Sequence, residues 1–199
     1  MSKNFLEAVQ SRRSIYALSK ESTISDARIQ EIVEAAVLHS PTSFNSQSSR
    51  VVVLLGDKHD KVWDITTETL RKIVPADSFE GTAQKLASFK AGYGTVLFFE
   101  DQAVVKNLQE NFALYAENFP IWSNQSSGIL QHVVWTAFAE EGLGASLQHY
   151  NPLIDDEVKS TFGIPADWKL IAQMPFGKTA SAPGDKEFQP VEDRVKVIK

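Results

Sequence analysis

The sequence has 199 residues, 43% of them apolar and 23% charged, with no cysteine and a net charge of −5 at neutral pH. We expect one domain over residues 1–199, and the lack of cysteine excludes disulfides, thiolate metal sites and cysteine nucleophiles. The acidic balance argues against a nucleic-acid partner, and the lack of an apolar run of membrane or signal-peptide length predicts a cytoplasmic protein with no membrane partner.

The first half of the chain is predicted to alternate helices with one strand. A short helix is expected over residues 4–11, and a clearer one follows Ser25, a suitable N-cap, and ends before Pro41. Residues 50–56 form a continuous β-branched run, which is typical of a strand buried on both faces. Two polar amphipathic helices follow it, over residues 57–74 and 79–90.

The second half repeats this alternation. A buried strand is expected over residues 95–100, followed by helices over 102–113, 123–141 and 155–162, and short strands over 145–149, 169–174 and 194–198. The helix over 123–141 carries a wide apolar stripe, which suits either a central helix or one shared between two subunits, and Gly142 is its expected C′ residue. This pattern predicts an α+β fold, an α/β sandwich with a central mixed sheet flanked by helices.

Common catalytic and metal motifs do not occur in this sequence. There is no phosphate loop, no dinucleotide-binding glycine motif after a strand, and no nucleophile elbow. The four histidines lack metal-ligand spacing, so no metal site is expected, and His59 is interpreted as a solvated helix residue.

The first polar segment of interest follows the short N-terminal helix. Arg12, Arg13 and Ser14 place two guanidinium groups and a hydroxyl together, and an arginine fork matches phosphate oxygens in a bidentate manner. The alternative interpretation is a charged helix C-terminus, where arginine is also favourable.

The second polar segment, residues 40–49, lies between an apolar helix and a strand. It is rich in hydroxyls and contains Asn45 and Gln47, whose amides offer donors and acceptors suited to the edge of a heterocycle. A polar turn capped by its own side chains is the alternative interpretation.

Taken together, these segments resemble the nitroreductase family of FMN-dependent oxidoreductases. The resemblance rests on Arg-Arg-Ser at residues 12–14, Ser-Pro-Thr-Ser-Phe-Asn-Ser-Gln at 40–47 and Gly-Leu-Gly at 142–144, and it extends over almost the whole chain. The sequences of residues 40–50, 94–100 and 144–152 are similar to those of a subgroup that contains bacterial nitroreductases and yeast Frm2-like proteins.

The resemblance implies an intertwined homodimer with two FMN sites at the subunit interface. One subunit would hold the phosphate and ribityl chain, and the loop after Pro41 would approach the same flavin from the other subunit. The residues that the resemblance assigns to the cofactor are Arg12, Arg13, Ser14, Tyr16, Pro41, Thr42, Ser43, Asn45, Gln47, Gln148, His149, Tyr150, Lys186 and Arg194.

Two positions depart from the family pattern. Many relatives have a basic residue where this chain has Tyr16, and many have Pro-Trp where this chain has Ser48 and Ser49. Lys85 or Lys90 is the alternative source of positive charge facing the flavin.

The expected reaction is a ping-pong exchange in which NADH or NADPH passes hydride to flavin N5, and a nitroaromatic, quinone or similar acceptor then receives it. No side chain is assigned a catalytic role, because the flavin carries the hydride. The aromatic candidates for the acceptor wall are Phe44, Trp63, Phe89, Tyr93, Phe119, Trp122 and Tyr150, with residues 119–122 favoured. Two alternatives stay open: a flavin-binding redox regulator in lipid or oxidative-stress signalling, and an FMN-free interaction protein.

Overall fold

Five strands form the central sheet in the computed structural model, which describes residues 4–199. The first three residues, which belong to the stretch inspected for a signal peptide, lie outside the described part. The strands are β1 (Leu18–Ser19), β2 (Ser49–Leu55), β3 (Gly94–Asp101), β4 (Leu143–Ala145) and β5 (Trp168–Thr179). The helices are α1 (Phe5–Ser11), α2 (Asp26–His39), α3 (Asp57–Arg71), α4 (Phe79–Lys90), α5 (Gln102–Asn111), α6 (Phe119–Glu140) and α7 (Asp155–Phe162), and the 3-10 turns are η1 (Ser43–Asn45), η2 (Ala113–Tyr115) and η3 (Val191–Asp193).

The strands follow the order β1-β5-β3-β2, and β4 also pairs with β5. These strand pairs are antiparallel. In their register, Val96 of β3 lies between Val53 of β2 and Met174 of β5. A parallel contact is supplied by an isolated bridge between Ser14 and Ala145. The expected α+β fold is confirmed, with an open antiparallel sheet whose parallel component is this bridge.

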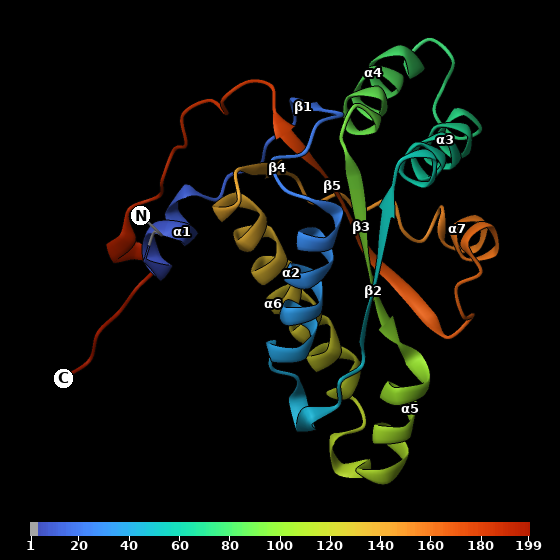
Figure 1. The fold of residues 1–199 in the computed structure, drawn as a ribbon. Coiled ribbons are helices and arrows are strands. Elements are labelled where there is room, and N and C mark those ends of the chain that lie inside the picture. The colour runs from blue at the N-terminus through green and yellow to red at the C-terminus, as the bar shows by residue number, and fades with distance from the viewer. Residues whose placement is uncertain (1–3) are drawn as a thin grey trace.

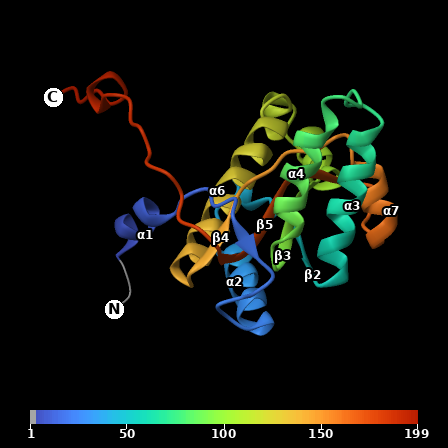
Figure 2. The same ribbon diagram turned by 90° about the horizontal axis from the view of Figure 1, so that it is seen from above.

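Helices cover both faces of the sheet (Figure 1). One face packs against α2 and α6, and Val96 and Phe98 of β3 belong to that core. The other face packs against α3, α4 and α7, and its core contains Leu97 and Phe99. Successive β3 side chains therefore enter opposite cores, which is why the strand is apolar without alternation. Figure 2 shows α1 and the C-terminal segment to one side of this layered body.

Local sequence signals account for where several helices begin and end. The side chains of Asn4 and Ser25 accept hydrogen bonds from backbone N–H groups in the first turns of α1 and α2, as the N-cap prediction for Ser25 required. Pro120 stands in the first turn of α6, where its missing N–H costs no helical hydrogen bond, so α6 begins earlier than expected. Gly142 follows α6 with a φ of 79°, the left-handed conformation typical of a C′ residue. None of the helices within residues 4–199 is both long and apolar enough to cross a membrane.

Three of the expected strands differ from the structure. The strand expected over residues 145–149 is instead β4 at Leu143–Ala145, and Gln148 forms an isolated bridge with Gln173. β2 is an edge strand, so Leu54 is its one fully buried residue, although both faces were expected to be buried. No strand forms over residues 194–198, where η3 is followed by irregular chain. A strand needs a neighbour to accept its backbone hydrogen bonds, and here Val195 and Val197 are 59% and 75% exposed.

The expectation for His59 was wrong, because this residue is fully buried. Its Nδ1 lies 2.8 Å from the Thr95 hydroxyl, and its Nε2 lies 3.1 Å from the Lys90 carbonyl oxygen. Because the Lys90 carbonyl can only accept, Nε2 carries the proton of the neutral ring, and Nδ1 accepts a hydrogen bond from the Thr95 hydroxyl, whose oxygen accepts one from Trp63 Nε1 at 2.9 Å. Burial lowers the pKa of His59, and the neutral imidazole links α3 to β3 and to the end of α4. The spacing of His59 from Val62 and Trp63 on α3 indicated this buried face.

Candidate functional site

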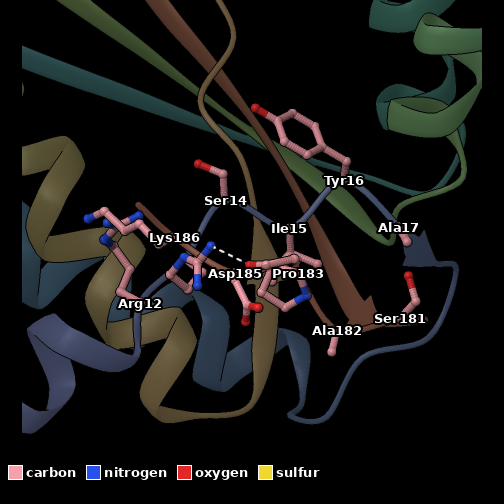
Figure 3. Close-up of a pocket in the computed structure, with 12 residues that line it drawn as sticks. Arg12, Ser14, Ile15, Tyr16, Ala17, Ser181, Ala182, Pro183, Asp185 and Lys186 are labelled. Carbon is pink, nitrogen blue, oxygen red and sulfur yellow. Dashed lines mark hydrogen bonds between the residues drawn. The ribbon is translucent and has the colours of Figure 1, made fainter. Parts of the chain in front are cut away.

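A cavity of about 530 Å³ opens between the segment after α1 and the loop that follows β5 (Figure 3). Its volume falls in the range of roughly 300–1,000 Å³ that is typical of small-molecule sites. The two walls are distant in sequence and adjacent in space. We call this space the basic cavity; it is lined by Arg12, Arg13, Ser14, Ile15, Tyr16, Ala17, Ser181, Ala182, Pro183, Gly184, Asp185 and Lys186.

Charge is unevenly distributed in the basic cavity. Three cationic side chains face one carboxylate, that of Asp185. Figure 3 shows Arg12 and Lys186 at one end of the cavity, Tyr16 at the other, and Ser14 between them. The cavity therefore has a cationic end suited to an anion and a neutral end with an aromatic hydroxyl.

Arg12 is a half-buried cation that lines the basic cavity. Its guanidinium carbon lies 4.3 Å from the centre of the Trp135 ring, a cation–π contact. Its Nε atom is buried and has no hydrogen-bond partner among the described residues. Burial and the neighbouring charge of Arg13 lower the pKa of Arg12, although an arginine stays protonated in proteins. A buried cationic donor without a partner indicates a place for an anionic ligand.

Arg13 connects the two walls of the basic cavity. Its Nη2 donates a hydrogen bond of 2.8 Å to the carbonyl oxygen of Gly184, shown as a dashed line in Figure 3. Lys186, two residues farther along the same loop, also lines the cavity. The bond therefore holds the loop where the Lys186 ammonium can add to the positive charge of the arginines.

The backbone at Ser14 is fixed by close contact with β4. Ser14 bridges Ala145, and the Ile15 N–H donates to the Ala145 carbonyl oxygen at 2.9 Å. This contact requires the glycine at position 144, because a Cβ atom there would lie 2.7 Å from Thr179 Oγ1 and 2.8 Å from Ile15 Cγ2. Gly144, which belongs to the Gly-Leu-Gly motif, thus sets the position of Ser14.

The second predicted segment forms a strained loop between α2 and β2. Phe44, Asn45 and Gln47 have φ angles of 58°, 49° and 49°, in the left-handed region. Such a conformation costs a non-glycine residue roughly 1–3 kcal/mol. Thr42 braces the loop: its Oγ1 accepts the N–H of Gln47 and its carbonyl accepts the N–H of Asn45, both at 3.0 Å. Strain concentrated in so few residues is typical of ligand-binding loops.

A smaller cavity, of about 200 Å³, lies beside this loop. We call it the loop cavity. Thr42, Asn45 and Gln47 line it, whereas Pro41 and Ser43 do not. The amides of Asn45 and Gln47 are on exposed residues, so they are available to a ligand. The remaining lining residues are Val37, Leu38, Ser40, Ser49, Arg50 and Leu130.

Phe44 extends from the loop into an aromatic cluster formed with Phe112, Tyr115, Phe119 and Trp122. The centre of its ring lies 5.1 Å from that of Phe112, 5.2 Å from that of Phe119 and 6.0 Å from that of Trp122. Phe44, Phe112 and Tyr115 are 52%, 42% and 46% exposed, so one side of the aromatic cluster faces solvent. The structure thus joins the predicted loop to the favoured aromatic stretch at residues 119–122.

The basic cavity and the loop over residues 42–47 contact α6 at different points, and the two cavities share no lining residue. Arg12 stacks on Trp135 near its C-terminal end, whereas Phe44 packs on Trp122 near its N-terminal end. At a rise of 1.5 Å per residue, the two tryptophans are about 20 Å apart along the helix. In Figure 1, α1 lies near the upper end of α6, and the loop after α2 lies near its lower end. One chain therefore does not bring its two predicted half-sites together.

The third predicted segment, residues 148–150, is fixed against β5. The backbones of Gln148 and Gln173 exchange hydrogen bonds of 2.7 and 2.9 Å. The side-chain Oε1 of Gln173 accepts the N–H of Tyr150 at 2.8 Å. The Tyr150 ring meets Trp63 edge-on at 6.0 Å, and burial raises the pKa of Tyr150, while His149 is exposed.

Three predicted cations do not line either cavity. Arg194 is an exposed residue just beyond η3. Lys90 Nζ pairs with Asp64 at 2.6 Å, and Lys85 Nζ lies 6.0 Å from the centre of the Phe89 ring. Neither Lys85 nor Lys90 therefore supplies positive charge to the basic cavity, and the lysine that does line it, Lys186, lies at the end away from Tyr16.

Several contributors to the site were missed from the sequence. Trp135 carries Arg12, Gly184 anchors Arg13, and the buried carboxyl of Glu100 accepts hydrogen bonds from two serine hydroxyls beside the loop. Glu100 could have been found, because an acidic residue at the end of an apolar buried strand needs compensating partners. No local signal identifies Trp135 or Gly184, since their roles arise only when distant segments meet.

Comparisons with known proteins show which family this chain resembles in sequence and fold. The family model described as the nitroreductase family matches residues 9–178. Nitroreductase CinD from Lactococcus lactis, solved with nicotinic acid, is 50% identical with a TM-score of 0.91, and its complex with 4-nitrophenol gives 48% and 0.89; each covers 98% of this chain and 100% of that chain. In Saccharomyces cerevisiae, HBN1 is 37% identical over 188 residues, 92% of each chain, and nitroreductase FRM2 is 33% identical over 189 residues, 93% of each chain.

Proposed function

The chain belongs to the nitroreductase family, an oxidoreductase family that typically binds flavin, and we propose that it is an FMN-dependent oxidoreductase that works as a homodimer. NADH or NADPH would supply the electrons. Nitroaromatics, quinones and similar electron-poor compounds would accept them.

The incomplete bonding of Arg12 is the observation that carries this proposal. Its buried Nε lacks a partner in the described chain, in a cavity that also presents Arg13, Ser14 and Lys186. A phosphate monoester supplies several acceptor oxygens and negative charge, which arginine forks match in a bidentate manner. The single carboxylate, Asp185, does not outweigh the three cations. The residues present therefore fit the phosphate end of FMN.

Each residue of the basic cavity has a distinct proposed role. Arg12, Arg13 and Lys186 would hold the phosphate, and Ser14 would offer its hydroxyl to the phosphate or the ribityl chain. Tyr16 stands away from the cationic end and would meet the ring system with one hydrogen bond and no charge. The reduced cofactor would then be stabilised mainly by N–H donors rather than by a nearby cation.

A second copy of the chain would complete the site. Thr42, Asn45 and Gln47 line a cavity that shares no lining residue with the basic cavity, and Phe44 of the same loop packs on Trp122, about 20 Å along α6 from the Trp135 ring that contacts Arg12. The apolar stripe predicted on this helix also leaves residues uncovered: Ile129 and Val133 are 43% and 38% exposed. Both observations support a dimer in which α6 is shared and the loop of one copy faces the basic cavity of the other.

When bound, FMN would supply the redox chemistry, taking hydride at N5 from the nicotinamide and releasing it to the acceptor in a ping-pong sequence. No side-chain acid or base is needed for hydride transfer, so the residues of the chain would position the cofactor and shield it from water. Gln173 holds the backbone at Tyr150 through a hydrogen bond of 2.8 Å, and this segment would run beside the ring system.

The exposed side of the aromatic cluster would bind the acceptor. Offset or edge contacts between aromatic rings favour planar partners, and Phe44 and Trp122 are stacked with an angle of 20° between their planes. Trp63 and Phe89, also considered for this role, are buried in the core and are not available. The complex of CinD with 4-nitrophenol supports nitroaromatics as one acceptor class.

The proposal is tested by incubating the purified protein with FMN, removing free cofactor and recording the flavin absorbance. Under anaerobic conditions, NADH or NADPH should bleach the absorbance, and 4-nitrophenol or benzoquinone should restore it. Ser14→Ala should weaken cofactor retention, whereas Lys106→Ala, an exposed charge on α5, is the matched control. A protein that stays colourless in excess FMN contradicts the proposal, and one that binds FMN without turnover favours the redox regulator.

A further inference from the structure

We propose that Glu100 is a positioning residue which, together with Ser48 and Ser49, forms a buried clamp that fixes the strained loop over residues 42–47. The inference rests on the proposed function, because this loop supplies the second half of the cofactor site. Glu100 touches neither cavity and acts through the loop alone.

The clamp consists of one carboxyl group held by two consecutive hydroxyls. Glu100 lies near the end of β3 and is fully buried. Its Oε2 accepts a hydrogen bond from Ser48 Oγ and its Oε1 accepts one from Ser49 Oγ, both at 2.6 Å. The next backbone contact reinforces the pair, since the Asp101 N–H donates to the Ser48 carbonyl at 2.9 Å. Both oxygens of the acid are therefore committed to the two residues that directly follow Gln47.

A second contact from the same strand ends holds the loop itself. Arg50 Nη1 donates to the Gln47 carbonyl oxygen at 2.7 Å, and Arg50 Nη2 pairs with the Asp101 carboxylate at 2.9 Å. Gln47, whose backbone is left-handed, is thus fixed on its carbonyl side by Arg50 and followed immediately by the clamped serines. The exit of the loop cannot relax without breaking these contacts.

The cost of burying Glu100 indicates a role beyond packing. A carboxyl group is expensive to remove from water, and burial raises the pKa of Glu100 even though both serine hydrogen bonds and the charge of Arg50 oppose the shift. The preceding residues of β3, from Val96 to Phe99, are apolar and equally buried, so this strand does not need an acid for packing. What the acid adds is a directional attachment at the point where a loop with three left-handed residues joins the sheet.

The test compares removal of the whole clamp with removal of an unrelated buried hydroxyl. The triple variant Ser48→Ala, Ser49→Ala, Glu100→Leu takes away both sides of the clamp and so leaves no unpaired buried group. Thr66→Val is the matched control, because the Thr66 hydroxyl is buried in α3 and donates a hydrogen bond to the Val62 carbonyl of the same helix. Two quantities are measured on the full chain: the FMN dissociation constant by fluorescence titration, and amide hydrogen exchange of residues 42–47 without FMN.

We expect the triple variant to keep its melting temperature within a few degrees of the control. Its loop amides should exchange at least tenfold faster, and its FMN dissociation constant should rise about tenfold. Glu100→Gln, which retains one acceptor and adds an amide donor, should keep both quantities within about threefold of the wild type. A folded triple variant whose loop exchange rates and FMN affinity equal those of the wild type would overturn the inference.

Failure of the proposed function would be distinguishable. If the wild type binds no FMN, the proposed function fails, and the exchange rates of the cofactor-free proteins still decide whether the clamp fixes the loop. If the triple variant does not fold, Ser48→Ala removes a single hydroxyl and is read by the same exchange measurement against Thr66→Val. An unchanged loop in Ser48→Ala would then contradict the clamp, and faster exchange confined to residues 42–47 would support it.

Discussion

The basic cavity and the loop over residues 42–47 prepare for a ligand in different ways. The basic cavity gathers charge: Arg12, Arg13 and Lys186 come from two chain ends, and its C-terminal wall consists of exposed residues. The loop instead has a fixed backbone conformation: three of its residues are left-handed, Thr42 braces them, and the serine that follows the loop is hydrogen-bonded to a buried carboxyl. Coulomb attraction falls off gradually with distance, whereas the strained loop offers hydrogen-bonding groups at fixed positions. A phosphate can be held by the first kind of site, and the edge of a ring system needs the second.

This contrast predicts that the largest loss of cofactor affinity follows from removing charge. Arg12→Ala should raise the FMN dissociation constant by about 10- to 100-fold, because hydrogen bonds to charged groups contribute roughly 1.5–3 kcal/mol each. The FMN dissociation constant of Arg12→Lys should lie between those of the wild type and Arg12→Ala, because lysine keeps the positive charge but lacks the planar guanidinium group. Fluorescence titration at fixed ionic strength measures the effect, and a change below about threefold would contradict the role of Arg12.

The next largest effect should come from crowding the backbone beneath Ser14. Gly144→Ala places a methyl group 2.7 Å from Thr179 Oγ1 and 2.8 Å from Ile15 Cγ2. We expect a loss of about 1–3 kcal/mol in the free energy of unfolding, as overpacking usually costs. Gly81→Ala in α4 is the control: its Cβ would meet nothing within 4 Å, and it should gain up to about 1 kcal/mol. Urea denaturation compares the two, and equal stability of both variants would show that Gly144 is not constrained.

Removing an aromatic side chain should affect the acceptor more than the cofactor. Phe44→Ala deletes the ring at the centre of the aromatic cluster, so we expect the KM for 4-nitrophenol to rise roughly tenfold, since one aromatic contact is worth about 0.5–1.5 kcal/mol. The FMN dissociation constant should change less than about threefold. Leu114→Ala, a 94% exposed apolar residue in η2, is the control. A larger effect on FMN than on the acceptor would reverse the assignment.

The smallest predicted effect is a pH dependence of protein stability that arises from Glu100. Burial raises the pKa of Glu100 above its ordinary value of 4.5, with Arg50 and Asp101 as the neighbouring charges. The native state then holds this proton to higher pH than the unfolded chain, so the associated stability is present below about pH 4.5 and is lost as pH rises through the native value. The free energy of unfolding of the wild type, compared with that of Glu100→Gln at each pH, should decrease as pH rises from 4.5 towards 8. A difference that stays constant, or that moves in favour of the wild type, would contradict this sign.

Much of the fold could be predicted because its signals are local. The boundaries of α4 and α7 agree with the expected ranges, and β3 was visible because a strand between two cores is apolar throughout. The expected strand over residues 194–198 failed because a strand is a pairing property, and one chain offers this segment no neighbour. The burial of β2 was overestimated for the same reason, since position in the sheet is not encoded in the strand's own residues.

The candidate site was predictable in part. Residues 12–16 and Lys186 line one cavity, and the loop residues Thr42, Asn45 and Gln47 line another, while their role in cofactor binding stays a prediction. The contact of Arg12 with Trp135 depends on tertiary packing and left no mark in the sequence. Ser48 and Ser49, which stand where many relatives have Pro-Trp, donate hydrogen bonds to Glu100, and these contacts form only when β2 pairs with β3.

Two copies of the chain are proposed to form each cofactor site jointly. The direct measurement uses a mixed dimer in which one copy carries Arg12→Ala and the other Asn45→Ala, isolated through two different tags. We predict that each variant alone binds FMN weakly, while the mixed dimer regains one strong site, because one of its two sites combines an intact Arg12 with an intact loop. A mixed dimer with no strong site, measured by FMN titration, would contradict the shared site and place both segments around a cofactor within one chain.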